Sequence, residues 1–315
     1  MQKKKLIRFS AAVFLAAVCV FGTACSRGAG NPADGQETGS ARLSEETAAA
    51  ETETEEETEA PVKTGPVEAD DVGYVLTPGL ALDLDAHLTT DSEITRRESS
   101  DESVAAFAED GSLIGCGRGQ CTVTLASGDN ELMLFINVAD QIVPGASYIG
   151  GVMICNKTYS IPADYNPGAD EEAYAALETM MLAATDDGIS LWLISGFRTY
   201  DYQAKIYSNY CARDGQAEAD RYSARPGHSE HQSGFAFDLN LADETFGDTA
   251  EGHWLAEHCS EYGFILRYPH DKEAVTGYMY EPWHVRYLGK PMAQAVTESG
   301  LCLEEYLGID SVYAD

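Results

Sequence analysis

Two stretches in the C-terminal half of the chain decide its fold and chemistry: PGHSEHQSGFAFD at residues 226–238 and GYMYEPWHVRYLG at residues 277–289. Together they supply one set of possible zinc ligands: His231, Asp238 and His284. A catalytic zinc takes three protein ligands, among them imidazole nitrogen and carboxylate oxygen, and keeps one position open for water. Glu281 precedes the last ligand by three residues, close enough to take the proton of that water. The sequence therefore predicts one zinc ion in this domain.

The residues around these motifs, from about 146 to 308, alternate helical and extended patterns. The segment 170–187 has a cap-like start and an apolar stripe, and it ends before a glycine, which is typical of an amphipathic helix. Short strands with helices between them, and no regular parallel repeat, favour an α+β domain. We expect helices at 170–187, 200–212 and 254–262, and strands at 189–194, 234–241 and 264–268.

Four segments carry a family resemblance. SGFRTYDYQ (195–203), PGHSEHQSGFAFD, YGFILRYP (262–269) and GYMYEPWHVRYLG occur in the order and spacing of VanY-type zinc D-alanyl-D-alanine carboxypeptidases. The pattern SxHxxGxAxD followed by ExWH is shared with the related VanX-type dipeptidases. The resemblance covers essentially all of residues 146–308.

The resemblance implies a hedgehog/D,D-peptidase-like α+β fold, with a small antiparallel sheet and helices. It implies the same three zinc ligands, with Glu281 as general base and Arg198 stabilising charge on the scissile carbonyl oxygen. Gln203 and Ser229 fall on positions that contact substrate. The implied reaction removes the terminal D-alanine from peptidoglycan stem peptides.

Two alternatives remain open at this point. One is a D,D-dipeptidase or another cell-wall peptidase on the same scaffold. The other is a non-catalytic wall-binding protein with a structural zinc, against which the intact Glu281 argues, because a closed structural site needs no positioned base.

Several neighbouring side chains suit packing as well as function. His228 lies three residues before His231, but the preceding Pro-Gly favours a loop, so we expect a rim residue. Trp283 is expected to pack beneath the site. Tyr278 and Tyr280 suit either the cleft or the core.

Residues 73–141 read as short strands separated by Asp-Gly and Ser-Gly turns, which predicts a small antiparallel β-sandwich. The segment SSDESVAAFAEDGSLIGCGRGQCTVTL (99–125) resembles bacterial Ig-like domains. Cys116 and Cys121 suit either a small disulfide loop or core packing.

The N-terminal part has the sequence pattern of an export signal followed by a stalk. Residues 1–25 have a basic start, a short apolar run and small residues before Cys25, which resembles a lipoprotein signal ending at a lipidated cysteine. A plain cleaved signal is the alternative. Residues 26–72 contain 13 acidic and three basic residues and almost no large apolar ones, which predicts a disordered stalk. We therefore expect an extracytoplasmic protein anchored to the membrane by lipid.

The charge of the chain excludes one class of partner. The formal net charge is −32, with 52 acidic and 20 basic residues. A nucleic-acid-binding protein needs a basic face to displace counterions from phosphates, so nucleic acid is not an expected partner.

Lipidation of Cys25 can be tested on the protein isolated from a bacterial host. Mass spectrometry is expected to find a mature N-terminus at Cys25 carrying lipid, in the membrane fraction. An unmodified mature N-terminus, with the protein free in the medium, would contradict the anchor.

Overall fold

The computed structural model describes residues 64–89 and 92–314. The signal segment, Cys25 and the stalk up to residue 63 lie outside these residues. The chain divides into two units, and the second, residues 62–315, contains every described residue. Within the described ranges, no helix is both long and apolar enough to cross a membrane.

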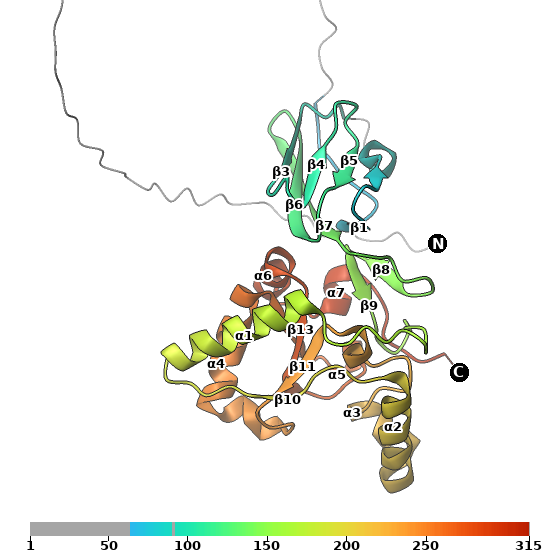
Figure 1. Ribbon diagram of the computed structural model, residues 1–315, viewed down its shortest axis with the longest axis vertical. Helices are drawn as coiled ribbons and strands as arrows, with labels where there is room; N and C mark the ends of the chain where they lie inside the picture. Colours follow the sequence, from blue (N-terminus) through green and yellow to red (C-terminus); the bar gives the residue numbers. More distant parts are fainter. Residues whose placement is uncertain (1–63, 90–91, 315) are drawn as a thin grey trace, which may run out of the picture. The chain divides into compact units, whose positions relative to one another are not determined.

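The first part of the second unit is a small β-domain of two sheets (Figure 1). One sheet has the strand order β1-β7-β6-β3 and the other β2-β5-β4. The predicted Ser-Gly turn, which begins at Ser127, joins two long strands as a tight hairpin, in which Ser127 pairs with Asn130. The strands are β1 (Gly73–Leu76), β2 (Ala81–Leu82), β3 (Arg96–Ser99), β4 (Ala105–Phe107), β5 (Leu113–Gly115), β6 (Gly119–Ser127) and β7 (Asn130–Val138), with a short 3-10 helix at Leu84–His87.

Two expectations for this region need correction. Strands β1 and β7 pair in parallel, so the β-domain is not wholly antiparallel. Val67 and Ala69, assigned to the stalk, are buried in the core of this domain because the strands that follow supply apolar partners such as Leu76 and Leu125. Of the two alternatives left open for Cys116 and Cys121, the structure has free thiols, with Cys121 buried in the core of this domain and Cys116 exposed.

A four-stranded sheet with the order β10-β11-β13-β12 forms the centre of the following domain. All three neighbouring pairs are antiparallel. A separate hairpin, β8 (Ser147–Ile149) and β9 (Val152–Ile154), precedes it. The sheet strands are β10 (Leu193–Ser195), β11 (Ala236–Leu239), β12 (Phe264–Tyr268) and β13 (Glu281–Tyr287).

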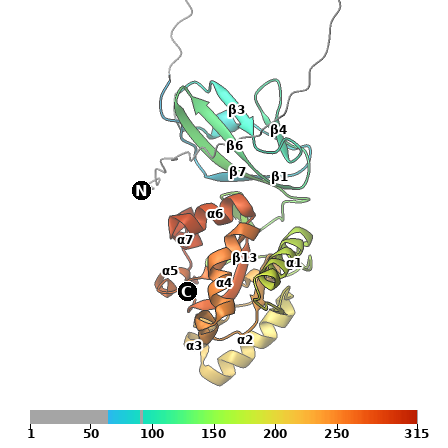
Figure 2. The same ribbon diagram turned by 90° about the vertical axis from the view of Figure 1, so that its left-hand side faces the viewer.

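One face of this sheet is apolar and is covered by helices. Alternate residues of β11 and β13, such as Phe237 and Val285, pack with Leu177 of α1 and Leu255 of α4 in one core. Helices α1 and α4 lie to one side of the strands, and α2 and α3 lie side by side on the other (Figures 1 and 2). The opposite face of β11 and β13 therefore presents polar side chains toward α2 and α3. The helices are α1 (Glu171–Asp186), α2 (Tyr200–Asp214), α3 (Gln216–Tyr222), α4 (Ala250–His258), α5 (Glu273–Thr276), α6 (Lys290–Ser299) and α7 (Leu303–Leu307), and short 3-10 helices are η2 (Glu230–Ser233), η3 (Glu244–Asp248) and η4 (Cys259–Tyr262).

The α+β architecture predicted for this domain is confirmed. Helix α1 begins after Asp170, whose side chain accepts hydrogen bonds from two backbone N–H groups, as the cap-like start predicted. The strand expected at 264–268 is β12, and the helix expected at 200–212 is α2. The helix expected at 254–262 is in fact α4 followed by the 3-10 turn η4. The strand expected at 189–194 is shorter and shifted to 193–195.

Candidate metal centre and active site

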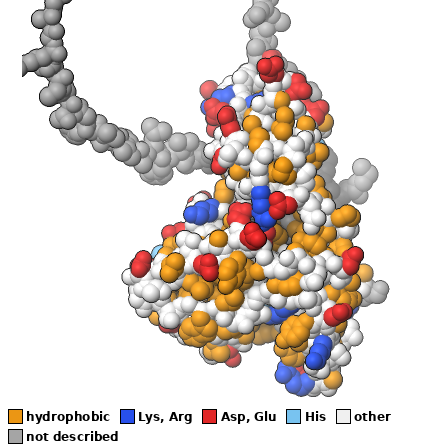
Figure 3. Space-filling view, in the orientation of Figure 1, with side chains coloured by type: hydrophobic (Ala, Val, Ile, Leu, Met, Phe, Trp, Pro, Cys, Tyr) orange, Lys and Arg blue, Asp and Glu red, His pale blue; other side chains and the backbone are white. Residues whose placement is uncertain are grey.

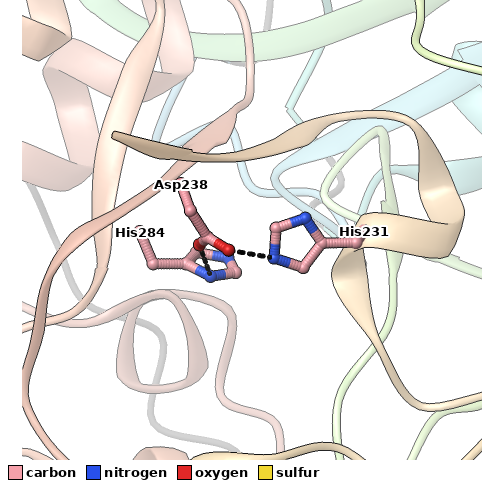
Figure 4. Close-up of side chains that lie close together, drawn as sticks. All are labelled: His231, Asp238 and His284. Carbon is pink, nitrogen blue, oxygen red and sulfur yellow. Dashed lines mark ion pairs between the residues drawn. The ribbon is translucent and has the colours of Figure 1, made fainter. Parts of the chain in front are cut away.

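The three predicted zinc ligands meet on the polar face of the sheet (Figure 4). Asp238 and His284 are direct cross-strand partners in the antiparallel pair β11–β13, so their side chains lie on the same face. His231 comes from η2, which precedes β11. One ligand atom from each residue lies within 4.8 Å of the other two, and all three residues are buried.

A glycine fixes the approach from η2 to β11. Gly234 has φ of +86°, in the left-handed region that glycine adopts without strain. A Cβ atom at this position would lie 2.5 Å from the carbonyl oxygen of Gly168. The turn therefore needs glycine for its backbone conformation and for space, which explains the glycine between His231 and Asp238.

Each histidine has one nitrogen turned toward the centre and the other toward an acceptor. His231 donates from Nδ1 to the carbonyl oxygen of Gly196 at 2.7 Å, which leaves Nε2 3.2 Å from Oδ2 of Asp238. His284 has Nδ1 3.2 Å from Oδ1 of Asp238 and Nε2 3.4 Å from Oε2 of Glu230. With its proton on the nitrogen that faces the acceptor, each ring can offer the lone pair of its other nitrogen to a metal ion.

The electrostatics of the cluster suit a cation. Oδ1 of Asp238 is buried and has no hydrogen-bond partner among the described residues, which is costly for a carboxylate oxygen. Burial opposes the charge of Asp238, but His231 and His284 outweigh it and hold the pKa of its carboxyl well below the usual range. Burial and the nearby Arg198 lower the pKa of His231, so its imidazole is neutral and able to bind a metal. Two imidazole nitrogens and a carboxylate oxygen are a donor set that zinc takes in catalytic sites.

Glu281 begins strand β13 and lies beside the ligands without joining them. Its Oε2 is 3.5 Å from Nδ1 of His284. Burial raises the pKa of Glu281 to about 8, with Asp238 and Glu230 adding to the effect against His284 and Arg198. A buried carboxyl whose pKa lies near neutrality is suited to accept and return a proton.

Arg198 follows β10 and lies next to the carboxylate of Asp238. Its Nη2 is 2.5 Å from Oδ2 of Asp238, and Nε and Nη2 both donate to Oγ of Ser195 at 3.0 and 2.9 Å. Ser195 is itself the cross-strand partner of Asp238. The sheet register therefore fixes a positive charge at the edge of the metal site.

The predicted substrate-contacting residues line the cleft above the ligands. This cleft has a volume of about 890 Å³ and is bordered by α2, α3 and the polar face of the sheet. Gln203 and Ser229 both line it and are almost fully buried. Gln203 donates from Nε2 to the carbonyl oxygen of Ala224 at 2.7 Å, while its Oε1 has no partner in the described part of the chain.

The remaining candidates divide between cleft and packing. His228 is not part of the ligand group, and its Nδ1 lies 2.8 Å from the carbonyl oxygen of Asn156. Trp283 packs in the core under the sheet, as expected. Tyr278 lines the cleft, whereas Tyr280 packs against His270. Glu230 is a residue that the sequence reasoning passed over, although it stands directly before the first ligand.

Comparison with known proteins assigns the family. The model of the VanY family, described as D-alanyl-D-alanine carboxypeptidase, matches residues 167–290. The chain is 35% identical over 153 residues to the bifunctional D-Ala-D-Ala dipeptidase and D-Ala-D-Ala carboxypeptidase VanXYC of Enterococcus gallinarum. This match covers 44% of the chain and 80% of VanXYC. The chain belongs to the VanY family.

Other similar proteins cover different shares of the chain. The putative carboxypeptidase YodJ of Bacillus subtilis (strain 168) is 39% identical over 178 residues, covering 49% of this chain and 65% of YodJ. The solved structure of the LdcB LD-carboxypeptidase is 38% identical with a TM-score of 0.48, covering 61% of this chain and 95% of LdcB. The chain spans 45% to 66% of the length of YodJ and two enterococcal D-alanyl-D-alanine carboxypeptidases.

The ligand assignment can be tested with two histidine variants. His231→Ala removes one of three ligands and is expected to retain less than about a tenth of the wild-type zinc after dialysis. His228→Ala is the matched control, three residues away and facing a backbone carbonyl, and should keep about one zinc per chain. Elemental analysis measures both. Equal zinc contents in the two variants would contradict the assignment.

Proposed function

We propose that the protein is a zinc-dependent D-alanyl-D-alanine carboxypeptidase that removes the terminal D-alanine from peptidoglycan stem peptides. The observation that carries this proposal is the convergence of His231, Asp238 and His284 with Glu281 beside them but outside the ligand set. A structural zinc site needs four protein ligands and no neighbouring base. The arrangement therefore favours hydrolysis over a purely structural site.

The residues of the chain have distinct tasks in this reaction. A bound zinc ion lowers the pKa of a water to about 7 and polarises the scissile carbonyl. Glu281 accepts a proton from the attacking water at its carboxylate and delivers it to the amine of the leaving D-alanine as the C–N bond breaks. Arg198 offers a fixed positive charge near the carbonyl oxygen, where negative charge develops. Gln203 and Ser229 offer polar contacts to the peptide in the cleft.

The size of the cleft favours a stem peptide over a free dipeptide. Its volume of about 890 Å³ extends from the ligands to Tyr210 and Tyr222 on α2 and α3, well beyond the room that two alanine residues fill. A D,D-dipeptidase activity, as in the name of VanXYC, is the alternative. Comparing a pentapeptide ending in D-Ala-D-Ala with the free dipeptide separates the two, and we expect the pentapeptide to be the better substrate.

The N-terminal segments suggest where the reaction takes place. We propose an extracytoplasmic protein held to the membrane by lipid on Cys25, with residues 26–63 as a stalk. The signal-like residues 1–25 and the acidic composition that follows support this location. We also propose that residues 73–141 are a bacterial Ig-like module acting as a spacer, supported by its two sheets around one apolar core.

The role of Glu281 is tested by Glu281→Ala. The variant is expected to keep its zinc, because Glu281 is not a ligand, and to lose hydrolysis of the pentapeptide by about 100-fold or more. D-alanine release and zinc content are measured on the same preparation. Turnover at the wild-type rate would show that another group carries the proton.

A further inference from the structure

Four charged side chains form a fully buried cluster behind the metal site. Glu230 accepts at Oε1 from Nε of Arg267 at 2.8 Å and from Nη1 of Arg286 at 3.1 Å. Glu304 accepts from Arg267 through both carboxylate oxygens, at 2.8 and 2.5 Å. No side chain in this cluster is more than 2% exposed. Two negative and two positive charges balance, so the cluster is neutral as a whole.

One carboxylate oxygen of this cluster faces the metal site. Oε2 of Glu230 lies 3.4 Å from Nε2 of His284. Neither atom has a conventional hydrogen-bond partner elsewhere among residues 64–89 and 92–314, and both are fully buried. Leaving a buried polar atom without a partner costs free energy. Oε2 of Glu230 and Nε2 of His284 are therefore the partners available to each other.

The position of Glu230 selects one tautomer of His284. Nδ1 of His284 faces Asp238 and Glu281, so it is the nitrogen that offers its lone pair to a metal. The ring proton must then be on Nε2, where an acceptor is needed. A carboxylate that accepts this proton fixes the orientation of the ring and makes it a better electron donor.

We propose that Glu230 is a positioning residue that holds His284 as the Nε2–H tautomer and thereby sets the zinc affinity. This inference rests on the zinc site proposed above. Glu230 directly precedes His231 in the sequence, yet its side chain lies beside the other histidine ligand, His284 of β13. The two arginines hold Oε1 in place, which leaves Oε2 free for the histidine.

The second carboxylate of the cluster has a different task. Glu304 balances the second arginine and accepts from Nδ2 of Asn156 at 3.1 Å. Within the described residues it makes no hydrogen bond or ion pair with His284 or another candidate ligand. Removing its charge changes the net charge of the cluster by the same amount as removing that of Glu230. Comparing substitutions of Glu230 and Glu304 therefore separates a direct effect on His284 from a general effect of the buried charge.

The test compares Glu230→Gln with Glu304→Gln in otherwise unchanged protein. Zinc dissociation constants are measured by competition with a chromophoric chelator, and the folding of each metal-free variant is checked by thermal unfolding. Glu230→Gln is expected to weaken zinc binding by about 10- to 100-fold, whereas Glu304→Gln should change it by less than about threefold. A loss of less than tenfold in Glu230→Gln, or an equal loss in both variants, would overturn the proposal.

A second measurement applies to the wild-type protein if either variant fails to fold. Nitrogen-15 spectra of zinc-loaded protein with labelled histidines report which ring nitrogen carries the proton. We expect His284 to show a metal-bound Nδ1 and a slowly exchanging proton on Nε2. A proton on Nδ1, or rapid exchange at Nε2, would overturn the proposal. Because these readouts need no substrate, they are independent of whether the protein releases D-alanine.

Discussion

The register of β11 against β13 is the constraint on which the site depends. It places Asp238 opposite His284, on the face away from the apolar core. The intervening residues of both strands point into that core, so a slip by one residue would bury the ligands against α1 and expose the core residues. The hydrophobic packing that stabilises the sheet therefore also determines the spacing of the metal ligands.

The charged side chains near these two strands form two layers. The ligands and Glu281 face the cleft, and the neutral cluster of Glu230, Glu304 and two arginines lies behind them. Buried charges are tolerated when they are paired and hydrogen-bonded, as they are in this cluster. On the face shown in Figure 3, acidic side chains are scattered over the surface.

The sequence singled out the main helices, and the three candidate ligands that the structure brings together, because their signals are local. Asp170 at a cap position, the apolar stripe after it and the paired motifs all lie within short windows. Strand β13 was not predicted as a strand, because EPWHVRY is buried on both faces and shows no alternation of polar and apolar residues. The role of Glu230 was also missed, since it depends on Arg267, Arg286 and His284, which are distant in sequence. The burial of Val67 depends in the same way on strands that follow it.

The most direct test of the central claim is D-alanine release by the purified protein from a pentapeptide ending in D-Ala-D-Ala. The measurement is made on the zinc-loaded protein, after removal of the metal with a chelator, and after zinc is returned. We expect release that stops with the chelator and recovers with zinc. A zinc-loaded protein that releases no D-alanine from any stem peptide, or release that the chelator leaves unchanged, would contradict the claim.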